Sequence, residues 1–182
     1  HMKHGIEIFP PFKKDDIPVK LAAPIKGFNT ESMDSEDWTY PIQYKLRLDT
    51  LRGLSPHGLY AYCAMVQAIQ DAGLSEDEIS NPKTGLFTAS SGSVFMTYNH
   101  LNRMFKVGVL RASPQGIISS IVGTLNFNLV AAFKIKGASS GFASACSSSG
   151  HALGYAYDEI SLGRHDRMFV VGGEDGNFLS IM

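Results

Sequence analysis

Cys146 is the residue in this sequence best placed to act as a nucleophile. It follows the small residues Ser140–Ala145 and precedes Ser147–Gly150, where a helical pattern begins. Backbone N–H groups at a helix N-terminus have no partner within the helix, and together with the helix dipole they favour a thiolate. A thiolate attacks carbonyl carbon, and a backbone N–H of the same turn could bind the oxyanion formed on a thioester. A cysteine that packs as a small hydrophobe in a tight turn is the alternative, and the spacing leaves both open.

Two other patterns in the sequence could suggest a nucleophile. Gly137–Gly141 matches G-x-S-x-G, the nucleophile elbow of α/β-hydrolases, but an elbow requires a helix directly after it. Because Phe142–Ala145 are expected to continue as a strand, we interpret this match as a chance one. Cys63 recurs with Leu59 and Val66 at helical spacing, which predicts a core residue.

No general base for Cys146 can be identified from the sequence. His151 comes five residues later, which turns it about 140° around the helix, so we expect it to pack or hydrogen-bond beneath the turn. His57 at a helix start and His100 in a helical stretch are predicted to be surface or structural residues. The two cysteines are far apart, so the sequence predicts neither a disulfide framework nor a paired-cysteine metal site.

The elements that must position Cys146 alternate between helix and strand after residue 55. Ser55-Pro56 predicts a helix start and Gly73 its end. The next predicted elements are a strand over 84–90, a helix through 98–105, and a helix that starts at Pro114, carries apolar residues as far as Leu129 and is ended by Gly137. A strand over 140–145, a helix over 147–162 and a strand over 168–173 follow. This order predicts an α/β fold with a mostly parallel sheet covered by helices.

Further expectations concern single segments of the chain. In the helix over 147–162 the predicted buried face is Ala152, Leu153, Ala156, Tyr157 and Ile160. Residues 3–54 are interrupted by prolines and are predicted to be irregular, with short strands. Residues 1–2 have the sequence of a cloning scar and are excluded from the fold prediction.

Composition narrows the class of protein. The chain has 182 residues, is 44% hydrophobic and carries a net charge of −1, which favours a globular protein over a disordered one. A near-neutral charge argues against a nucleic-acid partner, since nucleic-acid-binding domains usually have a basic excess. No apolar run reaches the roughly 20 residues needed to span a bilayer, so we expect no membrane association, and the cytoplasm is the expected compartment.

Residues 55–177 resemble the N-terminal half of a β-ketoacyl-acyl-carrier-protein synthase, the elongating condensing enzyme of fatty-acid synthesis. The stretches that carry the resemblance are Tyr62–Gly73 (YCAMVQAIQDAG), Pro114–Gly137, Ala143–Gly150 (ASACSSSG), His151–Asp166 and Val170–Glu174 (VVGGE). The resemblance implies that residues 55–182 form half of a thiolase-like fold and carry the nucleophile turn.

The resemblance also implies roles for individual residues. Cys146 falls on the acyl-accepting nucleophile of the family, and its backbone N–H on one half of the oxyanion hole. Ile121 lies in the segment that lines the acyl-chain pocket across the dimer interface. The implied reaction is acyl transfer to Cys146 and decarboxylative condensation with a malonyl thioester, without cofactor or metal. The implied partners are acyl carrier protein and a second copy of the chain.

The point at which the sequence ends leaves alternative functions open. The sequence ends at Met182, before the half that carries the two catalytic histidines of the family, so we expect an incomplete portion of a synthase. The alternatives are a non-catalytic scaffold or dimerisation fragment, and another thiolase-superfamily acyltransferase.

Acyl carrier proteins are acidic, and two basic clusters in the sequence could dock one. The first is Lys45, Arg47 and Arg52, and the second is Arg103, Lys106 and Arg111.

Overall fold

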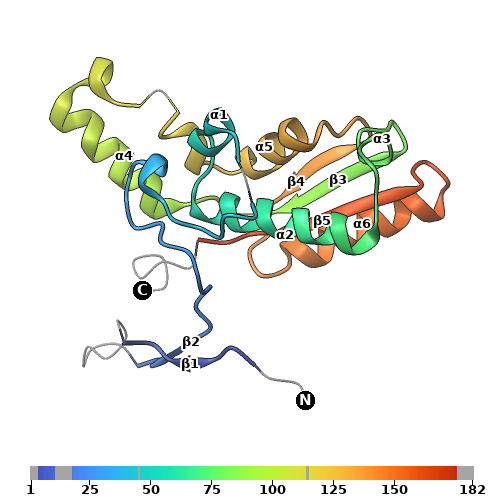
Figure 1. Cartoon of the computed structure of the whole chain (residues 1–182), viewed down its shortest axis with the longest axis horizontal. Helices are drawn as coiled ribbons and strands as arrows, with labels where there is room; N and C mark the ends of the chain where they lie inside the picture. The colour runs from blue at the N-terminus through green and yellow to red at the C-terminus, as the bar shows by residue number, and fades with distance from the viewer. Residues whose placement is uncertain (1–3, 11–17, 45, 114, 176–182) are drawn as a thin grey trace.

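A three-stranded parallel sheet forms the centre of the protein (Figure 1). The computed structural model describes residues 4–10, 18–44, 46–113 and 115–175. The strands are β3 (Thr84–Ala89), β4 (Ser139–Phe142) and β5 (Arg167–Gly172), in the order β4-β3-β5. Both pairings are parallel, with Leu86 opposite Ser139 on one side and Phe169 on the other. The predicted α/β class with a parallel sheet is confirmed.

Strand β3 is the middle strand of the sheet, and helices cover both faces of the sheet at this strand. Every residue of β3 is buried. Leu86 packs in one core with α2 (Pro56–Ala72) and α5 (Thr124–Phe133), whereas Phe87 packs in another with α6 (Ser148–Ser161). Successive strand residues point to opposite faces, so the residues of β3 pack against two helical layers at once.

Helix α2 has the ends that its sequence predicts. Ser55 is the N-cap, Pro56 occupies the first turn, and Gly73 ends the helix in the left-handed conformation with φ 64°. Cys63 lies in a core with Leu59 and Met96, as its helical spacing predicts.

The predicted helix from Pro114 to Leu129 is wrong. Pro114 lies outside the described residues, and the segment forms a short 3-10 helix, η4 (Ile118–Ser120), followed by α5. Ile121 between them is extended, and Gly123 is left-handed with φ 93°. Ser120 also accepts a hydrogen bond at its carbonyl from the N–H of Ser93, which holds the break against the start of α4 (Val94–Val107).

The predicted face of α6 is only partly right. Ala152 and Ala156 are buried against Phe87, but Leu153 and Tyr157 are 63% and 70% exposed. The three-stranded sheet is narrow here, since β4 is its edge, and beyond the two alanines Tyr155 of α6 stacks on Phe142 at the end of β4. Half-exposed Ile160 also lies outside this contact. The other face of α6 is therefore apolar and uncovered in the described part of the chain.

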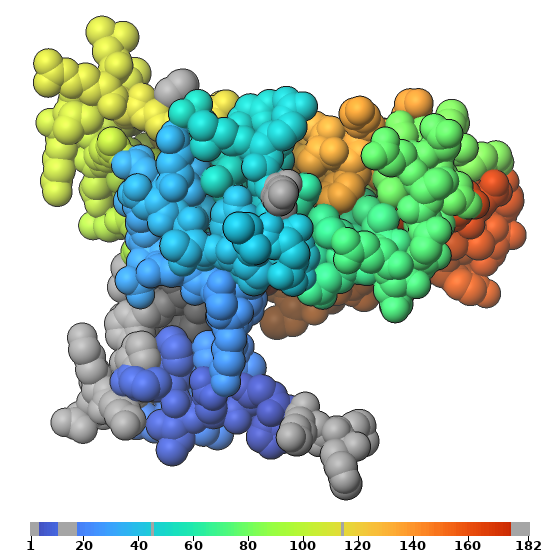
Figure 2. Space-filling model, viewed as in Figure 1, coloured from blue at the N-terminus to red at the C-terminus, as the bar shows by residue number. Residues whose placement is uncertain are grey.

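The N-terminal residues form two separate structures. Strands β1 (Glu7–Ile8) and β2 (Leu21–Ala22) pair in an antiparallel ribbon that stands away from the sheet and helices (Figures 1 and 2). Residues 28–44 and 46–54 instead pack on α2, where Trp38, Tyr44 and Leu51 are buried. This segment contains η2 (Ser35–Asp37) and α1 (Leu48–Arg52). The predicted short strands are confirmed, while the residues after them contribute a core that the proline-rich sequence did not predict.

The remaining described elements connect these layers. They are α3 (Glu76–Ile79), which begins with a capping box between Ser75 and Glu78, and the 3-10 helix η3 (Val109–Arg111), which follows α4. Among the described residues, no helix combines the length and the apolar character needed to cross a membrane. Residues 1–2, the predicted cloning scar, lie outside the described residues.

Candidate active site

Cys146 lies at the carboxyl edge of the parallel sheet, between β4 and α6. The strand ends at Phe142, earlier than the predicted residue 145, and an isolated bridge pairs Ser144 with Cys146 before the helix begins at Ser148. The side chain of Cys146 is exposed. In open parallel sheets, ligands bind outside the carboxyl ends of the strands, so this thiol is where a substrate could reach it.

The turn that carries Cys146 has an unusual backbone. Ala145 has φ 48°, a left-handed conformation that few residues with a Cβ adopt. Such residues concentrate at functional sites, where the surrounding contacts hold them in place. The strain supports a functional role for the residue that follows it.

Ser148 supplies the contacts that hold this turn. Its buried hydroxyl accepts a hydrogen bond from the N–H of Ser144 at 2.7 Å and donates one to the carbonyl of Ala145 at 2.7 Å. The two bonds join the residues before Cys146 to the first residue of α6. The sequence did not identify Ser148, because a run of serines gives no signal of which hydroxyl faces inward.

Replacing Ser148 by alanine is expected to lower the free energy of unfolding by about 1–2 kcal/mol, because the two hydrogen bonds of its hydroxyl are lost. The loosened turn should also slow alkylation of Cys146. Chemical denaturation and timed alkylation measure both effects. Ser149→Ala, at the exposed next position, is the matched control, and Ser148→Thr should retain the wild-type values because it keeps the hydroxyl. Wild-type stability and reactivity in Ser148→Ala would show that the hydroxyl does not hold the turn.

The ends of strands β3 and β5 are joined by side chains that are distant in sequence. After β5, Glu174 accepts hydrogen bonds from the backbone N–H and the hydroxyl of Ser91, at 2.9 and 2.7 Å. The hydroxyl of Ser93 similarly donates to Asp175. These contacts fix the turn after β3 against the end of β5. Glu174 was singled out only as part of a matching stretch, and its partner could not be predicted from local sequence.

Ile121 lies at this same edge of the sheet. A Cβ placed on Gly92, in the turn after β3, would lie 2.5 Å from the carbonyl oxygen of Ser120 and 3.1 Å from the carbonyl carbon of Ile121. Gly92 is left-handed with φ 81°, and only glycine permits both the conformation and the close approach. The side chain of Ile121 is 47% exposed.

The histidines do not supply a base in the described part of the chain. His57 is buried, and its Nδ1 lies 2.9 Å from the hydroxyl oxygen of Ser55. Burial lowers the pKa of His57. His165 makes a hydrogen bond through Nδ1 with the carboxylate of Glu159, and its Nε2 accepts one from the backbone N–H of Ala138. His100 is buried, and burial lowers its pKa as well. His151 is exposed, which corrects the expectation that it packs beneath the turn.

Cys63 is buried, whereas Cys146 is exposed. Cys63 is 4% exposed, and burial raises the pKa of its thiol to about 11.

Within the described residues, no group of three or more His, Cys, Asp or Glu side chains could hold a metal ion. Gly137–Gly141 runs into strand β4 and is not followed by a helix, as expected for a chance match to the hydrolase elbow.

Comparison with known proteins identifies the family that the chain is similar to. The family model for the N-terminal domain of β-ketoacyl synthases matches residues 2–177. The chain is 32% identical to 3-oxoacyl-[acyl-carrier-protein] synthase 1 of Haemophilus influenzae over 178 residues, which cover 95% of this chain and 40% of that protein. It is 33% identical to the enzyme of the same name from Escherichia coli K12 over 128 residues, which are 69% of this chain and 32% of that protein.

Solved structures agree in fold. A β-ketoacyl synthase from Burkholderia phymatum superposes with a TM-score of 0.68 at 24% identity, over 89% of this chain and 38% of that one. A type II polyketide ketosynthase, solved with its acyl-carrier protein, gives 0.63 at 16% identity, over 71% of this chain and 38% of that one. The chain thus spans about 40% of the length of a curated relative and shares the fold of part of these ketosynthases. Since the family model matches nearly the whole sequence and the parallel sheet agrees with the solved structures, the chain belongs to the β-ketoacyl synthase family.

Proposed function

We propose that this chain is the acyl-accepting portion of a β-ketoacyl-acyl-carrier-protein synthase of fatty-acid synthesis, with Cys146 as its nucleophile. The observation that carries the proposal is the position of Cys146: an exposed thiol on a strained turn, directly before a helix and at the carboxyl edge of the sheet. The substrates are an acyl thioester and a malonyl thioester, both carried by acyl carrier protein.

The chemistry proceeds in two stages. The thiolate of Cys146 attacks the acyl thioester carbonyl, the backbone N–H of Cys146 supports the oxyanion, and the carrier thiolate leaves. The malonyl thioester then loses carbon dioxide, and the resulting carbanion attacks the acyl group on Cys146. Collapse of that adduct releases the β-ketoacyl carrier protein and restores the thiolate. Carbon dioxide loss generates the carbanion, so the proposal requires no cofactor or metal.

A loading assay tests this proposal. The chain is mixed with an acyl-carrier protein charged with a medium-length acyl group, and intact-protein mass spectrometry follows transfer. We expect one acyl group per chain in the wild type and in Cys63→Ala, and none in Cys146→Ala. No transfer to the wild type would favour the alternative of a non-catalytic scaffold or dimerisation fragment. Equal transfer to Cys146→Ala would place the nucleophile elsewhere.

The proposal includes a homodimer, in which Ile121 lines an acyl pocket completed by the second copy. Strand β4 supports this, because it is the edge of the sheet and Ser139–Gly141 are exposed. An uncovered edge strand and large apolar patches are surfaces that proteins usually cover. The large hydrophobic residues more than half exposed outside the β1–β2 ribbon include Val94, Tyr98, Phe105, Val109, Leu110, Ile118, Val122, Phe127, Leu153, Tyr155, Tyr157 and Leu162.

Sedimentation equilibrium should give the mass of a dimer at micromolar concentration, since the exposed edge and apolar side chains provide a large interface. A single species with the mass of one chain across the concentration range would contradict the dimer.

The proposed compartment is the cytoplasm, where the free thiols of Cys63 and Cys146 would stay reduced.

Docking of the acidic carrier protein is proposed for the basic side chains that the structure leaves available. Arg52 pairs with Glu36, Arg103 with Asp34 and Arg47 with Asp49, and Lys45 lies outside the described residues. Lys106 and Arg111 are exposed, and their side chains make no ion pair within the described part of the chain. These two are therefore the stronger candidates from the predicted clusters.

Charge reversal of both, as Lys106→Glu with Arg111→Glu, is expected to weaken carrier-protein binding by about tenfold at low salt and less as salt is added, because screening reduces the lost attraction. Titration calorimetry at two salt concentrations measures this. Lys136→Glu, an exposed lysine after α5, is the matched control. Unchanged affinity in the double variant at low salt would remove these residues from the docking surface.

A further inference from the structure

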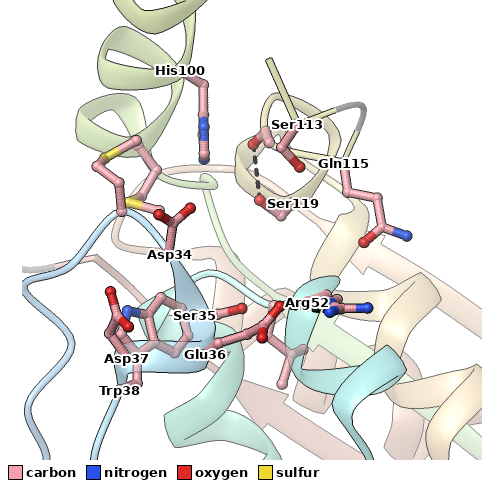
Figure 3. A pocket seen from close by; sticks show the side chains of 14 residues that line it. Asp34, Ser35, Glu36, Asp37, Trp38, Arg52, His100, Ser113, Gln115 and Ser119 are labelled. Carbon is pink, nitrogen blue, oxygen red and sulfur yellow. Dashed lines mark hydrogen bonds and ion pairs between the residues drawn. The ribbon is translucent and has the colours of Figure 1, made fainter. Parts of the chain in front are cut away.

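A pocket of about 390 Å³, whose lining does not include Cys146, lies between the η2 segment, α1, α4 and the residues Ser113, Gln115, Gly116 and Ser119 (Figure 3). Its size is within the range of small-molecule sites. Polar groups form two of its walls: Asp34, Glu36 and Asp37 on one side, and His100, Ser113 and Ser119 on the other. The side chains of Met33, Trp38, Leu54 and Met96 supply its apolar surface.

His100 is a largely buried polar residue whose side chain faces this pocket. Its side chain belongs to a residue only 8% exposed, yet its ring makes no hydrogen bond with any of the described residues. Figure 3 shows the ring pointing from α4 into the pocket, with the Asp34 carboxylate facing it from the other wall. No side-chain nitrogen or oxygen that is fully buried among the described residues lacks a partner, so the His100 ring nitrogen without a hydrogen bond is open to the pocket, where a ligand could reach it.

The backbone is shaped to accommodate this ring. A Cβ placed on Gly116 would lie 2.5 Å from Nδ1 and 2.8 Å from Cε1 of His100. Glycine at this position therefore lets the imidazole lie directly against the main chain. Burial lowers the pKa of His100, which favours the neutral ring with one nitrogen able to accept a hydrogen bond.

The carboxylates of the opposite wall also have unused acceptor capacity. Asp34 uses Oδ1 for Arg103, Glu36 uses Oε1 for Arg52, and Asp37 uses Oδ2 for the hydroxyl of Ser32. The second oxygen of each carboxylate accepts no hydrogen bond from the described residues. Arg52 pairs with Glu36 and Arg103 pairs with Asp34, which leaves Asp37 as the carboxylate without a cationic partner among the described residues. The charge around the pocket is therefore negative when His100 is neutral. Such a site favours a ligand that is cationic and donates hydrogen bonds.

We propose that this pocket binds a small organic ammonium ion, whose N–H groups donate to His100 and Asp34 while its apolar portion contacts the Met33, Trp38 and Met96 side chains. An anionic ligand is disfavoured by the three carboxylates. A neutral alcohol has a single O–H donor and could not satisfy both walls at once. The site is separate from the proposed acyl-transfer chemistry and does not depend on it.

Trp38 provides a direct test, since it is the only tryptophan in the sequence and lines the pocket. The protein is titrated at neutral pH with benzylamine, benzyl alcohol and benzoate, which share one ring and differ in the charge of the polar group. We expect a saturable change in Trp38 fluorescence with benzylamine, with a dissociation constant of about 1 mM. The alcohol and the carboxylate should give no saturable change in the same range.

Variants of the two walls make the test specific. Asp34→Asn and His100→Gln should each weaken benzylamine binding by about tenfold, because each removes a partner of the ammonium group. Asp77→Asn, an exposed carboxylate on α3, is the matched control and should bind as the wild type does. Asp34 is at the surface, so its variant keeps the test informative if His100→Gln fails to fold. Wild-type affinity in Asp34→Asn, equal binding of benzyl alcohol, or no saturable response to benzylamine would each overturn the proposal.

Discussion

Brief treatment with iodoacetamide at pH 7 is expected to alkylate Cys146 and leave Cys63 unmodified. Burial raises the pKa of Cys63 to about 11, so only about one molecule in ten thousand carries the thiolate at this pH. An ordinary exposed cysteine, with a pKa of about 8.5, has roughly 300 times more thiolate. The greater nucleophilicity of the more basic thiolate offsets part of this ratio, but the 4% exposure of Cys63 also blocks access. The labelling ratio should therefore exceed about tenfold.

Peptide mapping after timed labelling measures this ratio. Labelling of Cys63 should become efficient only as the pH approaches its raised pKa of about 11, or after denaturant unfolds the core that holds it. Denatured protein is the internal control, because both thiols should then react at similar rates. Preferential labelling of Cys63 in the folded protein would contradict the structural distinction between the two cysteines.

The 182-residue chain tested by itself is expected to become acylated without forming a β-ketoacyl product. Acyl transfer needs an exposed thiol on a held turn, which the chain has. Carbanion formation needs groups that stabilise the enolate. In the described part of the chain the histidines are buried, paired elsewhere or, like His151, exposed without a hydrogen bond to Cys146. General acid–base and electrostatic assistance each contribute factors of about 10²–10⁴, so losing both should leave no measurable turnover.

Incubation with acyl- and malonyl-carrier thioesters tests this, with protein mass and product followed together. A longer relative, such as the Escherichia coli enzyme of which this chain matches 32%, is the positive control for product. Product from the 182-residue chain that disappears in Cys146→Ala would show that the chain contains a catalytic base that the structure did not reveal.

Local sequence predicted the elements whose ends and burial are determined locally. Ser55-Pro56 and Gly73 bound α2 because capping depends on a few adjacent residues. Strand β3 was evident because its residues must fill cores on both faces of the sheet. By contrast, the break at Ile121–Gly123 depends on a contact between Ser93 and Ser120, which are far apart in the sequence. The apolar spacing continues across this break, so periodicity alone predicted one helix.

The candidate site was predictable to a similar extent. The placement of Cys146 between strand and helix followed from the small residues before it and the helical pattern after it. The left-handed Ala145 and the inward hydroxyl of Ser148 did not, because both depend on how the turn closes in three dimensions. The link between Ser91 and Glu174 joins the ends of two strands and has no local signature.

The measurement that tests the central proposal most directly is the location of the acyl group after loading from an acyl-carrier protein. Digestion and tandem mass spectrometry identify the modified residue, and release by neutral hydroxylamine identifies a thioester. The proposal predicts a hydroxylamine-labile acyl group on Cys146 and none on Cys63. An acyl group on another residue, or a wild-type chain that stays unmodified while its carrier protein remains charged, would contradict it.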